Sequence, residues 1–180
     1  MILVIDIGNT NTHFGMYAGD RLETHWSVLN SIIREQQDII LSGLNNYTIH
    51  QCTISCVVPS LRDLFNEVIL NNLGFSPLFI EYPSIKIPVH YNNPFELGID
   101  RVVNAVAAIK LYNIPCIIVD FGTATTFDVV SDKGEFMGGA IAPGISVSIE
   151  TLWTKTEQLP VVEVNIPESV IGKSTVECMQ

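Results

Sequence analysis

The stretch that decides the fold lies at the start of the chain and reads Val4-Ile5-Asp6-Ile7-Gly8-Asn9-Thr10-Asn11-Thr12. A second stretch repeats its plan and reads Ile118-Val119-Asp120-Phe121-Gly122-Thr123-Ala124-Thr125-Thr126. Each has an apolar strand, an aspartate, an apolar residue, a glycine and a cluster of hydroxyl or amide side chains before a second strand. Because the two copies lie far apart in the chain, they predict two related half-folds rather than a short solenoid repeat.

The composition of each loop suits a phosphate group. Glycine lets the backbone turn tightly and approach a ligand closely. The amides and the Thr and Asn side chains that follow can donate hydrogen bonds to phosphate oxygens. The aspartate at the strand end, Asp6 or Asp120, can hold a cation directly or through water. One such loop alone is more often a tight hairpin, but two copies rich in hydroxyl groups predict phosphate binding.

The bulk composition agrees with a phosphate site built from neutral groups. The chain has 180 residues, of which 47% are hydrophobic, and a net charge of −10 from nine Lys and Arg against nineteen Asp and Glu. So few basic side chains argue against a broad surface for nucleic acid or an anionic membrane. The chain starts without the features of a signal peptide, and no apolar run reaches transmembrane length. We therefore expect a soluble, cytoplasmic protein with neither nucleic acid nor membrane as a partner.

Apolar periodicity predicts the remaining elements. Strands are expected at residues 2–5, 14–17, 22–28, 53–58, 78–80, 117–119, 126–130 and 136–141. Helices are expected at residues 31–45, with Ser31 as the N-cap, and at 59–73, 99–112, 146–155 and 176–180. This order predicts an α/β protein in which residues 1–113 form an N-terminal domain and residues 114–180 begin a second domain.

A third motif, Gly98-Ile99-Asp100-Arg101, stands at the start of a predicted helix. An aspartate there can accept a proton from an alcohol, and an arginine can bind a polar or anionic group. The alternative interpretation is a helix-capping aspartate followed by a surface arginine.

Two better-known phosphate loops find no support. The G-x-G-x-x-G spacing of a dinucleotide fold is absent. Gly172-Lys173-Ser174 imitates the end of a P-loop, but Pro167 occupies the position that requires glycine, and no apolar strand precedes it.

Four motifs, in order and spacing, resemble those of the type III pantothenate kinases. They are Asp6-Ile7-Gly8-Asn9-Thr10, Gly98-Ile99-Asp100-Arg101, Asp120-Phe121-Gly122-Thr123-Ala124-Thr125 and Gly138-Gly139-Ala140-Ile141-Ala142-Pro143-Gly144. The resemblance runs from residue 1 to residue 180. It implies a duplicated ribonuclease-H-like fold of the actin-like ATPase class, with two mixed-sheet domains and ATP between them. Family members run further, so the resemblance also implies an incomplete second domain.

The resemblance implies a function and residue roles as well. A homodimer would phosphorylate pantothenate with ATP to 4'-phosphopantothenate, the first step of coenzyme A biosynthesis. Asp100 would be the catalytic base, Asp6 would lie near Mg²⁺, directly or through water, and Asp120 would hold a monovalent cation, K⁺ or NH₄⁺. ATP would be bound by Asp6, Ile7, Gly8, Asn9, Thr10, Asn11, Thr12, His13 and Thr123. Pantothenate would be bound by Tyr91, Gly98, Ile99, Asp100, Arg101 and, from across the dimer, Thr175.

Two other functions stay open at this point. The first is a nucleotide-binding regulatory relative with impaired catalysis, or a fragment, which the short chain favours and the intact Asp6, Asp100 and Asp120 oppose. The second is a kinase for a sugar or acetate, against which Tyr91 and the motif at residues 98–101 favour pantothenate.

Overall fold

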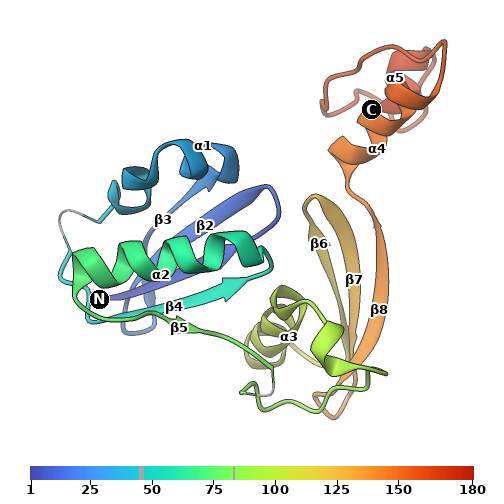
Figure 1. Ribbon diagram of the computed structural model, residues 1–180. Coiled ribbons are helices and arrows are strands. Elements are labelled where there is room, and N and C mark those ends of the chain that lie inside the picture. The colour runs from blue at the N-terminus through green and yellow to red at the C-terminus, as the bar shows by residue number, and fades with distance from the viewer. Residues whose placement is uncertain (45–46, 83) are drawn as a thin grey trace.

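The computed structural model describes residues 1–44, 47–82 and 84–180, which form two lobes and a small helical tail (Figure 1). The first lobe contains a five-stranded sheet of order β3-β2-β1-β4-β5. Its strands are β1 (Ile2–Ile7), β2 (Asn11–Ala18), β3 (Arg21–Leu29), β4 (Gln51–Cys56) and β5 (Leu78–Phe79). The first three strands are antiparallel, whereas β4 runs parallel to β1 and β5 runs parallel to β4. This order and these directions are those of a ribonuclease-H-like domain.

The alternation of side chains along β1 separates the core from the chemistry. Leu3, Ile5 and Ile7 are fully buried and share one apolar cluster with Phe65 of α2 (Pro59–Leu73). Because successive side chains of a strand point to opposite faces, Asp6 points away from this core. Helix α2 ends at Gly74 with a φ of 79°, the left-handed conformation that glycine adopts without strain.

The second lobe repeats the first half of this plan. Its sheet has the order β6-β7-β8, all antiparallel, with β6 (Cys116–Phe121), β7 (Ala124–Val130) and β8 (Phe136–Pro143) in the places of β1, β2 and β3. The described residues supply no counterpart of β4 and β5 here, so β6 lies at a sheet edge. The predicted fold class, a duplicated α/β fold with an incomplete second half, is therefore confirmed.

Helix α3 (Ile99–Leu111) packs on the second sheet and also contacts β4 of the first sheet. Its Val102 and Ala105 belong to a buried cluster with Val130 and Phe136. The short helix η2 (Pro94–Glu96) lies in the connection that leads to α3. The cluster begins before the boundary expected between residues 113 and 114, and the division into domains 1–113 and 114–180 stays a prediction.

One predicted helix is wrong in its form. A single helix capped by Ser31 was expected over residues 31–45, but the structure has α1 (Asn30–Glu35) followed by the 3₁₀ helix η1 (Gln37–Leu41). Gln36 interrupts them, because its backbone (φ −135°, ψ 82°) lies outside the helical region. The N-cap is Leu29. The expected end of the helix falls on residues outside the described ranges.

The tail after β8 contains α4 (Ile145–Lys155) and α5 (Thr175–Met179), and Figure 1 places it at the far end of β8 from α3. The segment Gly172-Lys173-Ser174, which imitates the end of a P-loop, leads into α5 and supplies its N-cap. Ser174 Oγ accepts a hydrogen bond from the Glu177 N–H (3.3 Å), and Glu177 Oε2 accepts one from the Lys173 N–H (2.7 Å). Within the described ranges, every helix is too short or too polar to cross a membrane.

Candidate active site

Asn30 holds the loop between β1 and β2 from its buried side and is only 5% exposed. Its Nδ2 donates hydrogen bonds to the carbonyl oxygens of Gly8 (2.7 Å) and Asn9 (3.1 Å), and its backbone N–H donates to the Thr10 oxygen (2.9 Å). In a trans peptide the carbonyl and the following N–H point in opposite directions. These bonds therefore direct the amides of residues 9–11 away from Asn30, an arrangement that suits an anion.

The loop between β6 and β7 is held by Gly144, which directly follows β8. The Gly144 N–H donates to the Thr123 carbonyl oxygen at 3.0 Å. A Cβ added at Gly144 would lie 2.2 Å from the Gly122 oxygen, so only glycine permits this approach. The motif at residues 138–144 therefore has a local structural reason, since its last glycine packs directly against the second loop.

The two loops meet, with 2.7 Å between Thr10 Oγ1 and Thr123 Oγ1, and a cavity of about 170 Å³ lies between them. Its walls are Asp6, Gly8, Asn9, Thr10, Asn11, His13, Asp100, Asp120, Phe121, Gly122, Thr123, Ala124 and Thr126. Most of the residues predicted to bind ATP thus come together with Asp100 and Asp120. The side chains of Ile7 and Thr12 are fully buried behind the cavity.

Three carboxylates share this cavity and influence one another. Burial raises the pKa of Asp6, the Ser55 hydroxyl and His13 lower it, and Asp120 raises it further. Burial also raises the pKa of Asp100, the Arg101 N–H lowers it in part, and the charges of Asp6 and Asp120 raise it. Like charges so close together favour a cation or a proton between them.

Ser55 is a site residue that sequence reasoning missed. It lies beside Asp6 on the neighbouring strand β4 and is 5% exposed. Its Oγ is close enough to lower the pKa of Asp6, yet it has no hydrogen-bond partner of standard geometry in the described part of the chain. This buried hydroxyl is therefore available to a group beside Asp6.

The donor set fits a metal ion that is bound largely by phosphate and water. Among the described residues, no three His, Cys, Asp or Glu side chains converge on a point that could hold a metal by themselves. Mg²⁺ commonly uses only one or two carboxylates beside substrate phosphates. Asp6 and Asp120 offer these, and Asp120 is oriented by Asn104, whose Nδ2 donates to its Oδ2 at 2.9 Å. Asn104 lies one turn after Asp100 on α3, a spacing that could have identified it from the sequence.

Asp100 stands in the first turn of α3 and still reaches the cavity. The N-cap residue is Gly98, and the Arg101 N–H in the first turn donates to Asp100 Oδ1 at 2.8 Å. A Cβ added at Gly98 would lie 2.5 Å from the same Oδ1, so glycine is needed for the carboxylate to fold back. Asp100 thus accepts a hydrogen bond from the first turn of α3 and lines the cavity, but it is not the N-cap residue of the alternative interpretation.

Arg101 is not the surface arginine of the alternative interpretation. It is 6% exposed, and its Nε and Nη2 both donate to Asp128 Oδ1, at 2.9 and 2.5 Å. Burial lowers the pKa of Arg101, but the hydrogen bonds and charge of Asp128 outweigh this and hold it above its ordinary value. Tyr91 also lies beside the guanidinium. Thr175, in contrast, lies on α5 in the tail, away from these residues of the same chain (Figure 1).

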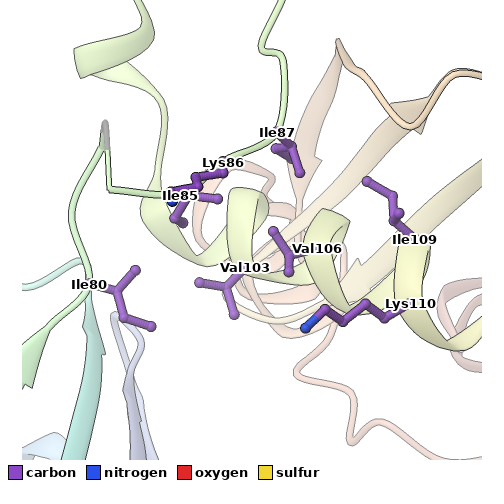
Figure 2. A pocket seen from close by; sticks show the side chains of 8 residues that line it. All are labelled: Ile80, Ile85, Lys86, Ile87, Val103, Val106, Ile109 and Lys110. Atoms are coloured by element: carbon purple, nitrogen blue, oxygen red, sulfur yellow. The ribbon is translucent and has the colours of Figure 1, made fainter.

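A larger cavity of about 410 Å³ lies against α3 (Figure 2). Its walls are Ile80, Ile85, Lys86, Ile87, Val103, Val106, Ile109 and Lys110. It contains neither a carboxylate nor a glycine-rich loop. The three motif aspartates and both glycine loops lie together in the smaller cavity, which is therefore the candidate active site.

The duplicated fold with its paired loops defines a nucleotide-binding protein of the actin-like ATPase class. The sequence model of the type III pantothenate kinase family matches residues 2–180. The chain is 44% identical to the type III pantothenate kinase of Moorella thermoacetica and 45% identical to that of Koribacter versatilis. Both alignments cover 100% of this chain, and they cover 74% and 73% of those proteins. The chain therefore belongs to the type III pantothenate kinase family.

A solved structure agrees with the fold. A conserved protein from Campylobacter jejuni, assigned to a Baf family of transcriptional activators, superposes with a TM-score of 0.60 at 22% identity. The match covers 98% of this chain and 71% of that one. At this identity the likeness shows the fold alone, so it gives no support to a regulatory function.

Proposed function

We propose that this chain transfers the γ-phosphoryl group of ATP to the primary hydroxyl of pantothenate, the first step of coenzyme A biosynthesis, with Asp100 as the base. Family membership supports the reaction. The observation that carries the assignment of roles is the cavity between the two loops, in which Asp6, Asp100 and Asp120 lie together.

The residues of the chain divide the chemistry among them. The amides of residues 9–11 and the hydroxyl of Thr123 bind and orient the phosphates of ATP. Asp100 accepts the proton of the attacking hydroxyl, and its raised pKa brings it closer to that task at neutral pH. A Mg²⁺ ion beside Asp6 and a monovalent cation, K⁺ or NH₄⁺, beside Asp120 would neutralise charge on the phosphoryl oxygens.

The acceptor side of the site combines Asp100 with its neighbours. Gly98, Ile99 and Tyr91 line the space for pantothenate, and Arg101 binds its carboxylate. Because Thr175 lies apart from them within one chain, it would reach pantothenate only from a second subunit, so the proposal includes a homodimer.

The test is ATP-dependent phosphorylation of pantothenate by this chain, with Mg²⁺ and with K⁺ exchanged for Na⁺. We expect product in K⁺ and much less in Na⁺, and no product from acetate or simple sugars. Folded protein that binds ATP but phosphorylates nothing would contradict the kinase assignment and favour a regulatory relative. Equal turnover in Na⁺ would remove the role of Asp120.

A further inference from the structure

Arg101, which follows the proposed base Asp100, is held by contacts with the second lobe. The guanidinium of Arg101 extends from the start of α3 to β7, where two of its nitrogens donate to one oxygen of Asp128. Its Cζ also lies 5.7 Å from the centre of the Phe136 ring. Arg101 is thus fixed from two sides by the sheet of the second lobe.

Asp128 has little freedom of its own. It is 0% exposed, and its second oxygen, Oδ2, lies 3.5 Å from Thr126 Oγ1. Gly139 faces it on β8, and a Cβ there would lie 2.8 Å from Asp128 Oδ1 and 1.9 Å from the Phe127 oxygen. A carboxylate without solvent is stable only when it is paired and hydrogen-bonded. The pair therefore holds a single geometry.

This geometry decides which donors of Arg101 stay available. Arginine has five N–H donors in a rigid planar fork, and Asp128 occupies those on one edge. The Arg101 backbone N–H donates to Asp100 Oδ1, so Arg101 anchors the Asp100 carboxylate as well as carrying the guanidinium. Tyr91, which is half-exposed, lies beside the guanidinium, and the proposed function places it in the pantothenate site.

We propose that Asp128 is a positioning residue for the acceptor, which turns the free edge of the Arg101 guanidinium toward the carboxylate of pantothenate. This inference rests on the proposed function. Asp128 does not touch the substrate, and it acts only through Arg101. Its effect is accordingly confined to substrates that carry the carboxylate.

The test compares Asp128→Asn with the wild-type chain on two acceptors, pantothenate and the alcohol analogue in which a hydroxymethyl group replaces the carboxylate. Asparagine keeps the shape and one acceptor oxygen but loses the charge. We expect KM for pantothenate to rise about tenfold, the difference between a charge-assisted and a neutral hydrogen bond. The kinetic constants for the analogue and KM for ATP should change little.

Asp132→Asn is the matched control, because Asp132 is exposed in the turn between β7 and β8. In an Arg101→Lys background, Asp128→Asn should have no further effect on pantothenate. An equal loss with both acceptors would mean a merely structural role for Asp128, and no loss with either would also overturn the proposal.

Calorimetric binding of both acceptors without ATP distinguishes the role of Asp128 from the kinase activity itself. If the wild-type chain binds pantothenate but does not phosphorylate it, the kinase assignment is refuted, and the binding of the two acceptors still tests the role of Asp128. If the wild-type chain does not bind pantothenate, both proposals are overturned.

Discussion

Replacing Asn30 by alanine should loosen the loop between β1 and β2. Its side chain makes three hydrogen bonds, to the oxygens of Gly8 and Asn9 and from Thr12 Oγ1 (2.8 Å), and all three are lost. A buried hydrogen bond contributes about 1 kcal/mol. Because Asn9 is exposed, water can replace part of the lost bonding. We expect the free energy of unfolding to fall by about 2–3 kcal/mol.

The functional effect should be specific to the nucleotide. Without Asn30 the amides of residues 9–11 are no longer fixed before ATP binds, so part of the binding energy is spent on ordering them. Steady-state kinetics should show KM for ATP rising about tenfold, or 1.4 kcal/mol, with a smaller change in KM for pantothenate.

The matched control for this experiment is Asn71→Ala, the same chemical change at an exposed position of α2. Urea unfolding of both variants gives the stability change, and kinetics at a temperature well below each midpoint give the functional one. An Asn30→Ala protein with unchanged KM for ATP would refute the reasoning that this side chain orients the amides of the β1–β2 loop for ATP.

Three further predictions concern residues of the first turns of α3 and its N-cap. Gly98→Ala places a Cβ 2.5 Å from Asp100 Oδ1 and displaces the carboxylate, so kcat should fall while calorimetric ATP binding is retained. Because the pKa of Asp100 is raised in the folded protein, its ionised form destabilises the fold. Asp100→Asn should therefore raise the melting temperature of the ligand-free protein at neutral pH, and the gain should vanish below about pH 4, where the unfolded chain is also protonated. Asn104→Ala releases Asp120 Oδ2, so the K⁺ concentration for half-maximal activity should rise; an unchanged K⁺ dependence would argue against Asp120 as the cation ligand.

Features that depend on residues close together in the sequence were predictable. Period-2 apolar runs and short glycine turns identify β1, β2, β6 and β7, and the duplicated pattern identifies the fold class. The glycine after α2 and the start of α3 at Ile99 are local signals of the same kind. The prediction for residues 30–41 was wrong, because the apolar spacing fits one continuous helix whereas the backbone leaves the helical conformation at Gln36.

The residues that hold the site in place could not be predicted from local sequence patterns. Asn30 binds a loop from a distant part of the chain, and Asp128 pairs with Arg101 between two elements, so only tertiary packing brings them together. An aspartate within an apolar strand such as β7 is a signal that a buried partner is required. The identity of that partner was not predictable from spacing.

The most direct test of the account compares the wild-type chain with Asp100→Asn for ATP-dependent phosphorylation of pantothenate, with binding of both ligands measured by calorimetry on the same samples. We predict turnover by the wild-type chain and a kcat about 100- to 10,000-fold lower in the variant, with both ligands still bound. A variant with near-normal kcat would contradict the assignment of Asp100 as the base around which the site is built.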